Sequence, residues 1–432
     1  MRRYDLISCD ECGLLHRRMP LRPRERARCV RCTSILYRGV GADLNRMAAI
    51  IMATLLTFLI AQLCPIVGVD FNGQHTSSTL FGAIGVLWSE QMEAVAAVVF
   101  LFTIVYPALE LTALLYVTLA LRGGWRPPGL NTLLRMVAAA RRWSMTEVLM
   151  LGILVTLIKL HGQAKITPQP GLFAFAALTV MLAVVVAYDP RRLWNAGDDV
   201  AVPPPPPLHY RPVAGGPAPL VCHACGIVAA DAGIRRQSCR RCGKALHRRR
   251  PDSIGRTWAL LLAAAILYIP ANLMPVLYTH ALLGGQVDTI ISGVVYFWRT
   301  GAVALAVIIF TASILVPLLK LAVLSLLAWT SQRRSSWQPH QRTMLYRIVE
   351  FVGRWSMLDI FVITLTVALV RFKSLATITP GPGAMAFCAV VVLTMLASRA
   401  FDPRLIWDHA EPAPPHPPHP SNQPQQSGEP HV

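Results

Sequence analysis

Charged residues are scarce in this chain. Asp, Glu, Lys and Arg make up only 15% of its 432 residues, whereas hydrophobic residues make up 54% and the mean hydropathy is +0.47. A soluble globular domain typically carries about a quarter charged residues, so this composition excludes one. Long apolar segments must face lipid, and we predict a polytopic α-helical membrane protein.

Lys and Arg are missing from two of the connections between apolar runs, residues 70–91 and 280–298. Arginine is frequent in the alternate segments, which are the first 46 residues, 122–142, 235–250 and 333–354. Because cytoplasmic connections carry an excess of Lys and Arg, we expect both termini and both cysteine-rich segments to be cytoplasmic. The net charge of +19 then reflects orientation and attraction to anionic lipid heads, and we expect no nucleic-acid binding.

Eight apolar runs approach the length of about 20 residues that a helix needs to cross a bilayer. We predict transmembrane helices at 47–69, 92–121, 146–162, 171–188, 257–279, 301–329, 358–372 and 384–400. Pro65, Pro275, Pro107 and Pro317 lie inside apolar runs and predict matched kinks. The Arg-rich first 46 residues lack the short apolar run of a signal peptide, so we expect none before these helices.

The chain repeats its motifs in the same order after 210 to 213 residues. The first copy contains "CDEC", "CVRC", "AQLCPIV", "YPALELTALL", "RRWSM", "KITPQPG" and "YDPRRLW"; the second contains "CHAC", "CRRC", "ANLMPVL", "VPLLKLAVLS", "GRWSM", "TITPGPG" and "FDPRLIW". We therefore predict a tandem duplication, in which each half is a small cysteine module followed by four membrane helices. An even number of crossings gives both halves the same orientation in the membrane.

The repeats and two Pro-rich stretches divide the chain into six segments. We predict a four-cysteine module at 1–45, a transmembrane repeat at 46–197, a Pro- and Gly-rich linker at 198–219, a second four-cysteine module at 220–250, a second transmembrane repeat at 251–410 and a disordered Pro- and His-rich tail at 411–432.

Each module contains two CxxC pairs, whose spacing matches a tetrahedral four-cysteine metal site. The predicted ligands are Cys9, Cys12, Cys29, Cys32, Cys222, Cys225, Cys239 and Cys242. Zinc, one ion per module, is our first choice, and iron in a rubredoxin-like site is the alternative because the ligands are the same. A reducing cytosol argues against disulfides. Cys64 and Cys388 lie in apolar runs without cysteine neighbours, and we expect them to be packing residues.

Charged side chains inside a bilayer are costly and usually face an interior site. Glu110 lies deep in the second apolar run, and Lys320 occupies the equivalent position of the other copy. We hypothesise that these two side chains meet as an ion pair or line a central polar site. The alternative is a structural salt bridge that only fixes the register of the two halves.

Lys159 and Arg371 lie toward the outer ends of equivalent runs, and Glu147 and Asp359 lie at the inner ends. Glu147 and Lys159 are 12 residues apart, about 18 Å along a helix, so they cannot pair directly. We interpret the four as stations of a proton path or as contacts for a phosphate headgroup. For Lys159 and Arg371 the alternative is that they reach out to the outer interface.

Ser144 and Ser356 stand three residues before Glu147 and Asp359, which is the spacing of a helix-capping box. We expect each "RWSM" motif to begin the third helix of its half, with its tryptophan in the headgroup zone. Both serines are also candidates for the same polar path.

The two CxxC modules, each followed by four predicted helices with RWSM, ITPxPG and DPR motifs, resemble the paraquat-inducible protein A family (PqiA and LetA type) of Gram-negative inner membranes. The resemblance covers nearly the whole chain apart from the two Pro-rich segments. It implies cytoplasmic zinc-ribbon-like domains and a partnership with periplasmic MCE-domain (mammalian cell entry) tunnel proteins. It also implies the movement of lipids, with phospholipids as the expected cargo, between the inner and outer membranes.

On this basis we expect an inner-membrane subunit of an MCE-type lipid transport system rather than an enzyme. The chain has no GxxxxGK[ST] motif, so energy would come from an ion gradient, another subunit or the lipid gradient, and the intramembrane charges suggest proton coupling. Two alternatives belong to other classes: a membrane redox protein with iron in its cysteine sites, and a scaffold that anchors a partner without transporting.

Overall fold

The computed structural model describes most of the chain between Leu6 and His409. The described residues are 6–19, 21, 25–38, 44–71, 74–141, 143–161, 165–201, 219–231, 233, 237–281, 284–301, 303–369, 371–372 and 376–409. The predicted tail and most of the predicted linker therefore lie outside the described residues. So do the side chains of Lys159, Asp359 and Arg371.

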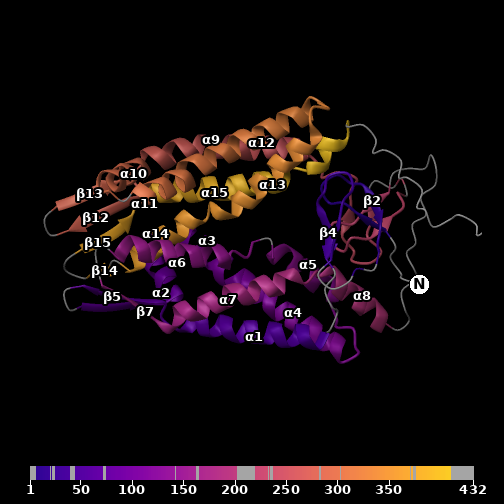
Figure 1. Cartoon of the computed structure of the whole chain (residues 1–432), viewed down its shortest axis with the longest axis horizontal. Helices are drawn as coiled ribbons and strands as arrows, with labels where there is room; N and C mark the ends of the chain where they lie inside the picture. The colour runs from indigo at the N-terminus through magenta and orange to yellow at the C-terminus, as the bar shows by residue number, and fades with distance from the viewer. Residues whose placement is uncertain are drawn as a thin grey trace, which may run out of the picture.

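The molecule is elongated, with the cysteine-bearing segments at one end and short strands at the other (Figure 1). Two helical halves run side by side between these ends: the first half, residues 44–201, and the second half, residues 253–407. We call residues 6–38 module 1 and residues 219–250 module 2. Their end of the molecule is the module end, and the opposite end is the strand end.

The two halves contain the same kinds of element in nearly the same order. The first half consists of α1 (Leu44–Leu63), β5 (Val67–Phe71), β6 (Gln74–Ser78), α2 (Leu80–Ser89), α3 (Glu93–Phe100), η1 (Leu101–Val105), α4 (Tyr106–Arg122), α5 (Leu130–Ala140), α6 (Thr146–His161), β7 (Lys165–Pro168), α7 (Pro170–Ala187) and α8 (Arg191–Val200). The second consists of α9 (Ser253–Leu273), β12 (Leu277–Ala281), β13 (Gly284–Asp288), α10 (Ile290–Arg299), α11 (Val303–Phe310), η2 (Thr311–Leu315), α12 (Val316–Gln332), α13 (Pro339–Trp355), α14 (Leu358–Leu369), β14 (Arg371–Phe372), β15 (Ala376–Pro380), α15 (Pro382–Ala400) and η3 (Pro403–Trp407).

Two small antiparallel sheets lie at the strand end. The strand order is β6–β5–β7 in the first half and β13–β12–β15–β14 in the second. In the first sheet Val67 lies opposite Pro168, so the chain that leaves α1 pairs with the chain that enters α7. The fold is mostly helical, as expected, but the expectation of an all-α protein is wrong for these segments. Their hydrogen bonds come from partners far away in sequence, which a local pattern does not reveal.

Pro65 and Pro275 end helices, and our prediction that they kink helices is wrong. α1 ends at Leu63 and α9 ends at Leu273, inside the first and fifth predicted spans, and a strand follows each. Proline has no N–H to donate and clashes with the preceding turn. Each proline therefore marks the point where the chain leaves a long helix for the sheet.

Pro107 and Pro317 lie inside continuous helical segments. Each is the second residue of an α-helix, α4 or α12, that follows directly from a π-helical turn, η1 or η2. A first-turn proline removes no hydrogen bond that an isolated helix would make, and a π-turn absorbs the irregular register where the helix continues. Both halves therefore contain a matched break in helical geometry at this level.

Six of the described helical segments are long and apolar enough to cross a membrane: Leu44–Leu63, Glu93–Arg122, Pro170–Ala187, Ser253–Leu273, Ala306–Gln332 and Pro382–Ala400. The third and seventh predicted spans coincide with α6 and α14, which have 16 and 12 residues. At 1.5 Å per residue these are about 24 and 18 Å long, shorter than the roughly 30 Å hydrocarbon core. The structure supports a multi-pass membrane protein.

The halves meet through α6 and α14, which pack against each other near the middle of the molecule (Figure 1). A Cβ atom added at Gly152 of α6 would lie 2.9 Å from the Cβ atom of Phe361 of α14, so glycine permits the close approach. Around this contact, α1 packs with α4 and α7, and α9 packs with α12 and α15. This arrangement places α4 and α12, which bear Glu110 and Lys320, in different halves.

Candidate functional site

The eight CxxC cysteines lie at hairpin ends in the two modules. The strands of module 1 are β1 (Leu6–Ser8), β2 (Leu15–Arg17), β3 (Arg26–Arg28) and β4 (Ile35–Arg38), and those of module 2 are β8 (Leu220–Val221), β9 (Val228–Ala229), β10 (Gln237–Ser238) and β11 (Ala245–Leu246). Each consecutive pair of strands is antiparallel, and one CxxC occupies the turn between its members.

All four turns have the same geometry. The residue after the second cysteine has a positive φ: 76° at Gly13, 61° at Thr33, 74° at Gly226 and 72° at Gly243. Its N–H donates to the carbonyl of the first cysteine over 2.8 to 3.0 Å. Glycine adopts this conformation without a steric penalty, and Thr33 is the exception among the four. The tight turn directs both sulfurs of each CxxC to the same side.

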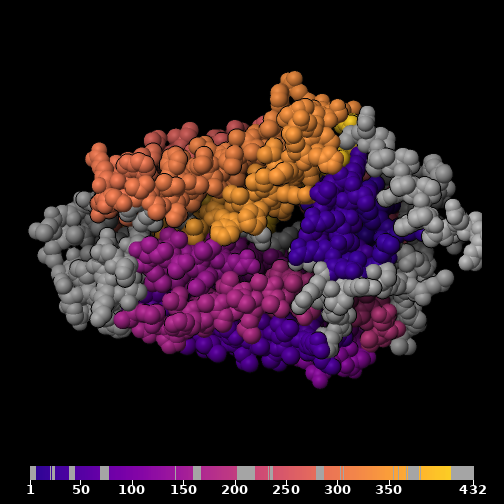
Figure 2. All heavy atoms as spheres, viewed as in Figure 1, coloured from indigo at the N-terminus to yellow at the C-terminus, as the bar shows by residue number. Residues whose placement is uncertain are grey.

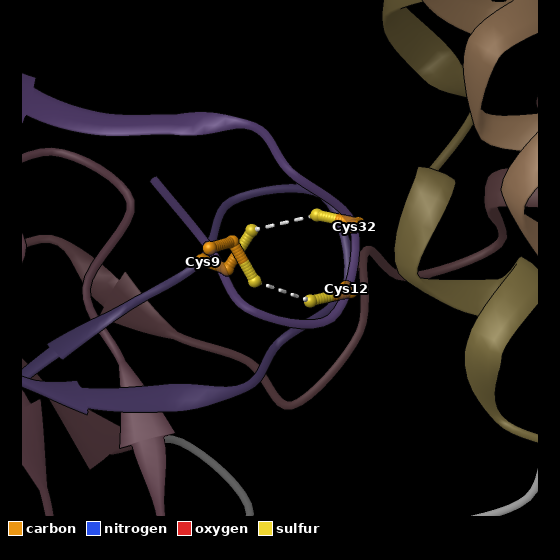
Figure 3. Close-up of side chains that lie close together, drawn as sticks. Cys9, Cys12 and Cys32 are labelled. Carbon is orange, nitrogen blue, oxygen red and sulfur yellow. Dashed lines mark hydrogen bonds between the residues drawn. The ribbon is translucent and has the colours of Figure 1, made fainter. Parts of the chain in front are cut away.

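The turns bring four sulfurs together in each module. The Sγ atoms of Cys9 and Cys32 are 3.5 Å apart, and so are those of Cys12 and Cys29 (Figure 3). The corresponding distances in module 2 are 3.4 and 3.6 Å. A tetrahedral zinc site with Zn–S bonds of about 2.3 Å has S···S edges of about 3.8 Å, so the cysteines fit a closed tetrathiolate site. The two clusters could each hold a metal ion.

Proton sharing within these clusters favours thiolates at some positions. Hydrogen bonding with the Cys12 thiol, and less strongly with the Cys9 thiol, lowers the pKa of Cys32 to about 6, although hydrogen bonding with Cys29 raises it. The thiol of Cys12 lowers the pKa of Cys29, and that of Cys225 lowers the pKa of Cys222. Metal ligands must be deprotonated, so this environment suits a cation that replaces the shared protons.

Two polar side chains that the sequence analysis did not single out lie against the sulfurs of module 1. The Oγ atom of Ser34 is 3.0 Å from Cys9 Sγ, and the Nε2 atom of His16 is 3.3 Å from Cys29 Sγ. Both can donate to a thiolate. Their short distance in sequence from a CxxC was the only available signal.

The second half contains a polar cluster around Lys320 of α12. This side chain is 1% exposed, and its Nζ atom donates to Thr394 Oγ1 of α15 over 2.8 Å. It also reaches Ser356 Oγ, between α13 and α14, at 3.5 Å. Gly353 borders the amine: a Cβ atom added there would lie 3.7 Å from Lys320 Cε. Two hydroxyl groups, one from α15 and one from the turn between α13 and α14, thus contact the buried amine.

The first half contains an ion pair at the equivalent level. Glu110 of α4 is fully buried, and Arg141 Nε donates to its Oε1 atom over 2.7 Å. Arg141 also donates to the carbonyls of Tyr188 (2.7 Å) and Val185 (3.3 Å) at the end of α7. Among the described residues, the second carboxylate oxygen of Glu110 has no hydrogen-bond partner.

The hypothesis that Glu110 pairs directly with Lys320 is therefore wrong in this structure. Each side chain is bonded within its own half, because α4 and α12 are separated by the α6 and α14 contact. The sequence shows a compensating exchange: Arg141 aligns with Gly353, and Glu110 aligns with Lys320. Where the acid is replaced by a base, the arginine is replaced by the smallest residue.

The remaining predicted path residues are dispersed. Glu147 is exposed in the first turn of α6, and Met145 rather than Ser144 directly precedes that helix, so Ser144 is not at the expected capping position. The backbone of Lys159 lies in the last turns of α6, and Arg371 begins strand β14 rather than ending a helix. The side chains of Arg371 and Asp359 lie outside the described residues, as does that of Lys159.

Trp143, which we expect in the headgroup zone, lies partly buried between aromatic and cationic groups. Its ring centroid is 5.2 Å from that of Phe102, and the guanidinium carbon of Arg399 in α15 lies 3.7 Å from its centroid. This cation–π contact joins the first half to the second.

Comparisons with known proteins place these features in a family. A model of paraquat-inducible protein A matches residues 44–198 and 254–411. The intermembrane transport protein PqiA of Escherichia coli K12 is 33% identical over 410 residues, which cover 93% of this chain and 95% of that protein. The lipophilic envelope-spanning tunnel protein A of the same strain is 31% identical over 411 residues (95% and 92%). A probable intermembrane transport protein of Haemophilus influenzae is 29% identical over 421 residues (94% and 96%). No solved structure matches the chain.

Proposed function

This chain belongs to the paraquat-inducible protein A family, and we propose that it is an inner-membrane subunit that passes phospholipids between the inner membrane and a periplasmic MCE-domain tunnel protein. In this proposal the termini and both modules are cytoplasmic and the strand end faces the periplasm. The names of the relatives, which refer to intermembrane transport and to an envelope-spanning tunnel, support the transport role. The arginine-poor segments 70–91 and 280–298 support the orientation.

The observation that carries the proposal is the buried amine of Lys320. Among the described side chains, which do not include that of Asp359, no carboxylate pairs with it. A charged ammonium in such a place is costly, so the amine either releases its proton or takes up an anion. We propose that protonated Lys320 binds the headgroup phosphate with Thr394 and Ser356, and that loss of the proton releases it.

Proton coupling in this proposal uses further polar side chains on the third helices. Glu147, Asp359 and Ser144 would supply stations toward the module end, and Lys159 and Arg371 would supply them toward the strand end. Glu110 has a different role, because its partner Arg141 stays charged at any physiological pH. We assign the Glu110 pair to fixing α4 against α7.

We further propose that each module holds one zinc ion, which supplies a closed tetrathiolate and no open coordination position. Such an ion folds a segment too small to form its own hydrophobic core. Metal analysis and an absorption spectrum of the purified protein separate this proposal from an iron redox protein, since ferric tetrathiolate is coloured and zinc tetrathiolate is not.

A transfer assay tests the role of Lys320. The protein would be reconstituted with the periplasmic protein that co-purifies with it, and the movement of a fluorescent phospholipid to acceptor vesicles would be followed with and without a proton gradient. Lys320→Met should abolish transfer. Lys320→Arg keeps the positive charge but cannot release its proton, so it should bind lipid and fail to turn over. Arg333→Gln, which removes one positive charge just beyond the end of α12, is the matched control.

The results of this assay separate the transport proposal from its alternatives. Full transfer by Lys320→Met would reject the amine as the site, and unchanged phenotype on neutralising Glu110, Lys320 and Lys159 together would favour a scaffold. Normal turnover by Lys320→Arg would reject proton release. Recovery of no periplasmic protein and no lipid from native membranes would contradict the transport proposal itself.

A further inference from the structure

Module 1 is docked on the second half, although it precedes the first half in sequence. Arg347 of α13 donates through Nε to Glu11 Oε2 over 2.7 Å and through Nη2 to the carbonyl of Cys32 over 2.7 Å. The guanidinium of Arg31 lies 4.6 Å from the ring centroid of Trp407 in η3. Figure 2 shows the indigo surface of module 1 against the orange surface of the second half. The contacting residues are inside or next to the CxxC turns.

Module 2 is docked on the first half, although it precedes the second half in sequence. Arg241, inside the turn between Cys239 and Cys242, forms a buried ion pair with Asp198 of α8 (2.8 Å) and donates to Asn195 over 2.7 Å. The side-chain amide of Asn131 in α5 donates to the carbonyl of Arg241 over 2.8 Å. Arg31 and Arg241 occupy the same position of their CxxC turns. Each contacts the half that does not follow its own module in the chain: Arg31 contacts the second half, and Arg241 contacts the first half.

The covalent connections run the opposite way. Module 1 continues along the chain into α1 of the first half, and module 2 continues into α9 of the second half. Where module 2 meets α9, the backbone N–H of Arg250 donates to Asp402 (3.1 Å) and the hydroxyl of Ser253 donates to the carbonyl of Ala400 (2.8 Å). Each module is thus continuous in the chain with one half and is also bonded through side chains to the other half.

Two sequence-equivalent arginines lie between the modules. Arg191 of α8 pairs with Asp10 of module 1 (3.1 Å), and a Cβ atom added at Gly226 of module 2 would lie 3.2 Å from its Cδ atom. Arg404 of η3 contacts His223 of module 2 through Nη2 (3.1 Å), and a Cβ atom at Gly13 of module 1 would lie 3.9 Å from its Cδ atom. Each half therefore inserts one arginine between both modules.

The two equivalent short helices at the strand end, α2 and α10, are packed differently. In the first half α2 packs against α14 of the second half and buries Leu80, Ala83, Ile84 and Leu87. Its counterpart α10 has no buried residue among those described. The ion pairs between the modules and the halves, within the described part of the chain, all lie at the module end.

We propose that the two metal modules form a crossed strap, which holds the two halves together at the module end and confines their relative movement to the strand end. Separation at the module end would require a module to leave one half while the chain keeps it on the other. Because the contacts lie on the CxxC turns, the strap holds only while each module keeps its metal. This inference does not depend on which cargo is carried.

Distances between equivalent positions of the two halves test the strap. Labels on genetically encoded noncanonical amino acids leave the cysteines untouched. One pair would replace Arg122 and Gln332, at the module ends of α4 and α12. Another would replace Ser78 and Asp288, the equivalent last residues of strands β6 and β13 at the strand end. The full chain would be measured in lipid nanodiscs, without any transport reaction. We expect a narrow distance distribution for the module-end pair and a broader one for the strand-end pair.

The charge of Arg347 provides the perturbation, because this residue lies outside the metal module. Arg347→Glu places like charges against Glu11 and should raise the population of longer module-end distances several-fold, with metal content unchanged. Glu11→Arg in the same chain should restore the narrow distribution. Arg135→Glu is the matched control, since Arg135 is the equivalent arginine of the first half and bonds Thr132 of its own helix.

Three results would overturn the strap: a wild-type module-end distribution as broad as that of the strand end, no change in Arg347→Glu, or no restoration by the reversed pair. Chelation of the metal should broaden the module-end distribution in the same way as Arg347→Glu. A protein that keeps these distances but transfers no lipid would contradict the proposed function and leave the strap intact.

Discussion

The exchange between the halves allows the first polar cluster to be converted toward the second. Glu110→Lys puts an ammonium beside Arg141, and Arg141→Gly leaves a buried carboxylate without its partner. Breaking a buried ion pair by changing one member costs about 3–5 kcal/mol. We expect each single variant to lose stability in this range, with Arg141→Gly at the upper end because it also loses its bonds to the carbonyls of Val185 and Tyr188.

The double variant, Glu110→Lys with Arg141→Gly, should lose less stability than the two single variants lose in total. With Arg141→Gly in place, a lysine at position 110 has the space that Gly353 leaves beside Lys320, and Ser144 is available at the position equivalent to Ser356. We expect a coupling energy of at least about 2 kcal/mol. The remaining loss reflects the carbonyls of α7 and the absence of a hydroxyl equivalent to that of Thr394.

Thermal unfolding of the detergent-purified protein, followed by tryptophan fluorescence and by size-exclusion chromatography of heated samples, would give the four stabilities. Glu110→Gln with Arg141→Gly serves as the control, because it removes both charges without adding an amine. Simple additivity of the two single losses would refute the exchange. So would a Glu110→Lys variant as stable as the wild type, since the pair would then contribute nothing to packing α4 against α7.

Three further predictions follow from single sites. Cys225→Ser should reduce metal content from two ions per chain toward one, measured by elemental analysis, while module 1 keeps its metal. Gly171→Ala should destabilise by about 1–3 kcal/mol because its Cβ atom would lie 2.5 Å from the carbonyl oxygen of Pro65, whereas Gly85→Ala, which meets open space, should not. Burial raises the pKa of Asp402, but the hydrogen bonds and charge of Arg404 outweigh this and lower it from 3.8 to about 2. The carboxylate of Asp402 therefore stabilises the folded protein fully above about pH 4, and this stabilisation is lost as the pH falls toward 2. Asp402→Asn should lower the free energy of unfolding by about 2 kcal/mol at neutral pH and by progressively less in acid. Unfolding measured across this pH range checks the prediction.

Local patterns in the sequence were sufficient for the cysteine clusters and most long helices. A CxxC turn positions two sulfurs through contacts within five residues, such as the hydrogen bond from Gly13 N–H to the Cys9 carbonyl. The geometry of the turn therefore depends only on residues next to one another in the sequence. The apolar runs likewise predict α7 and α15 to within two residues, because the bilayer requires a continuous apolar length.

The parts that depend on distant pairing could not be predicted in this way. β7 is a strand because β5, almost 100 residues earlier, offers it hydrogen bonds, and nothing in "KITP" requires that partner. Arg141 pairs with Glu110 because α5, which ends just before Arg141, packs against α4. From the local sequence alone, an arginine in an "RR" pair next to a tryptophan indicates a contact with lipid headgroups. The crossed docking of the modules is also invisible in the repeat, since either half would present the same motifs to either module.

The two halves share their motifs but differ in how they treat the one buried ionisable position on α4 and α12. In the first half, Glu110 accepts a hydrogen bond from a guanidinium that cannot release its proton, and that guanidinium also donates to a carbonyl at the end of α7. In the second half, Lys320 has hydroxyl partners, and the arginine position is the glycine that makes room for it. The positive charge of the second cluster is carried by an amine, which can lose its proton when it is desolvated, whereas the guanidinium of the first cluster keeps its proton. If transport is coupled to such a change, the second half carries the step while the first provides a rigid surface for it to move against. The strap at the module end then restricts that movement to the strand end, where α10 has no buried residue.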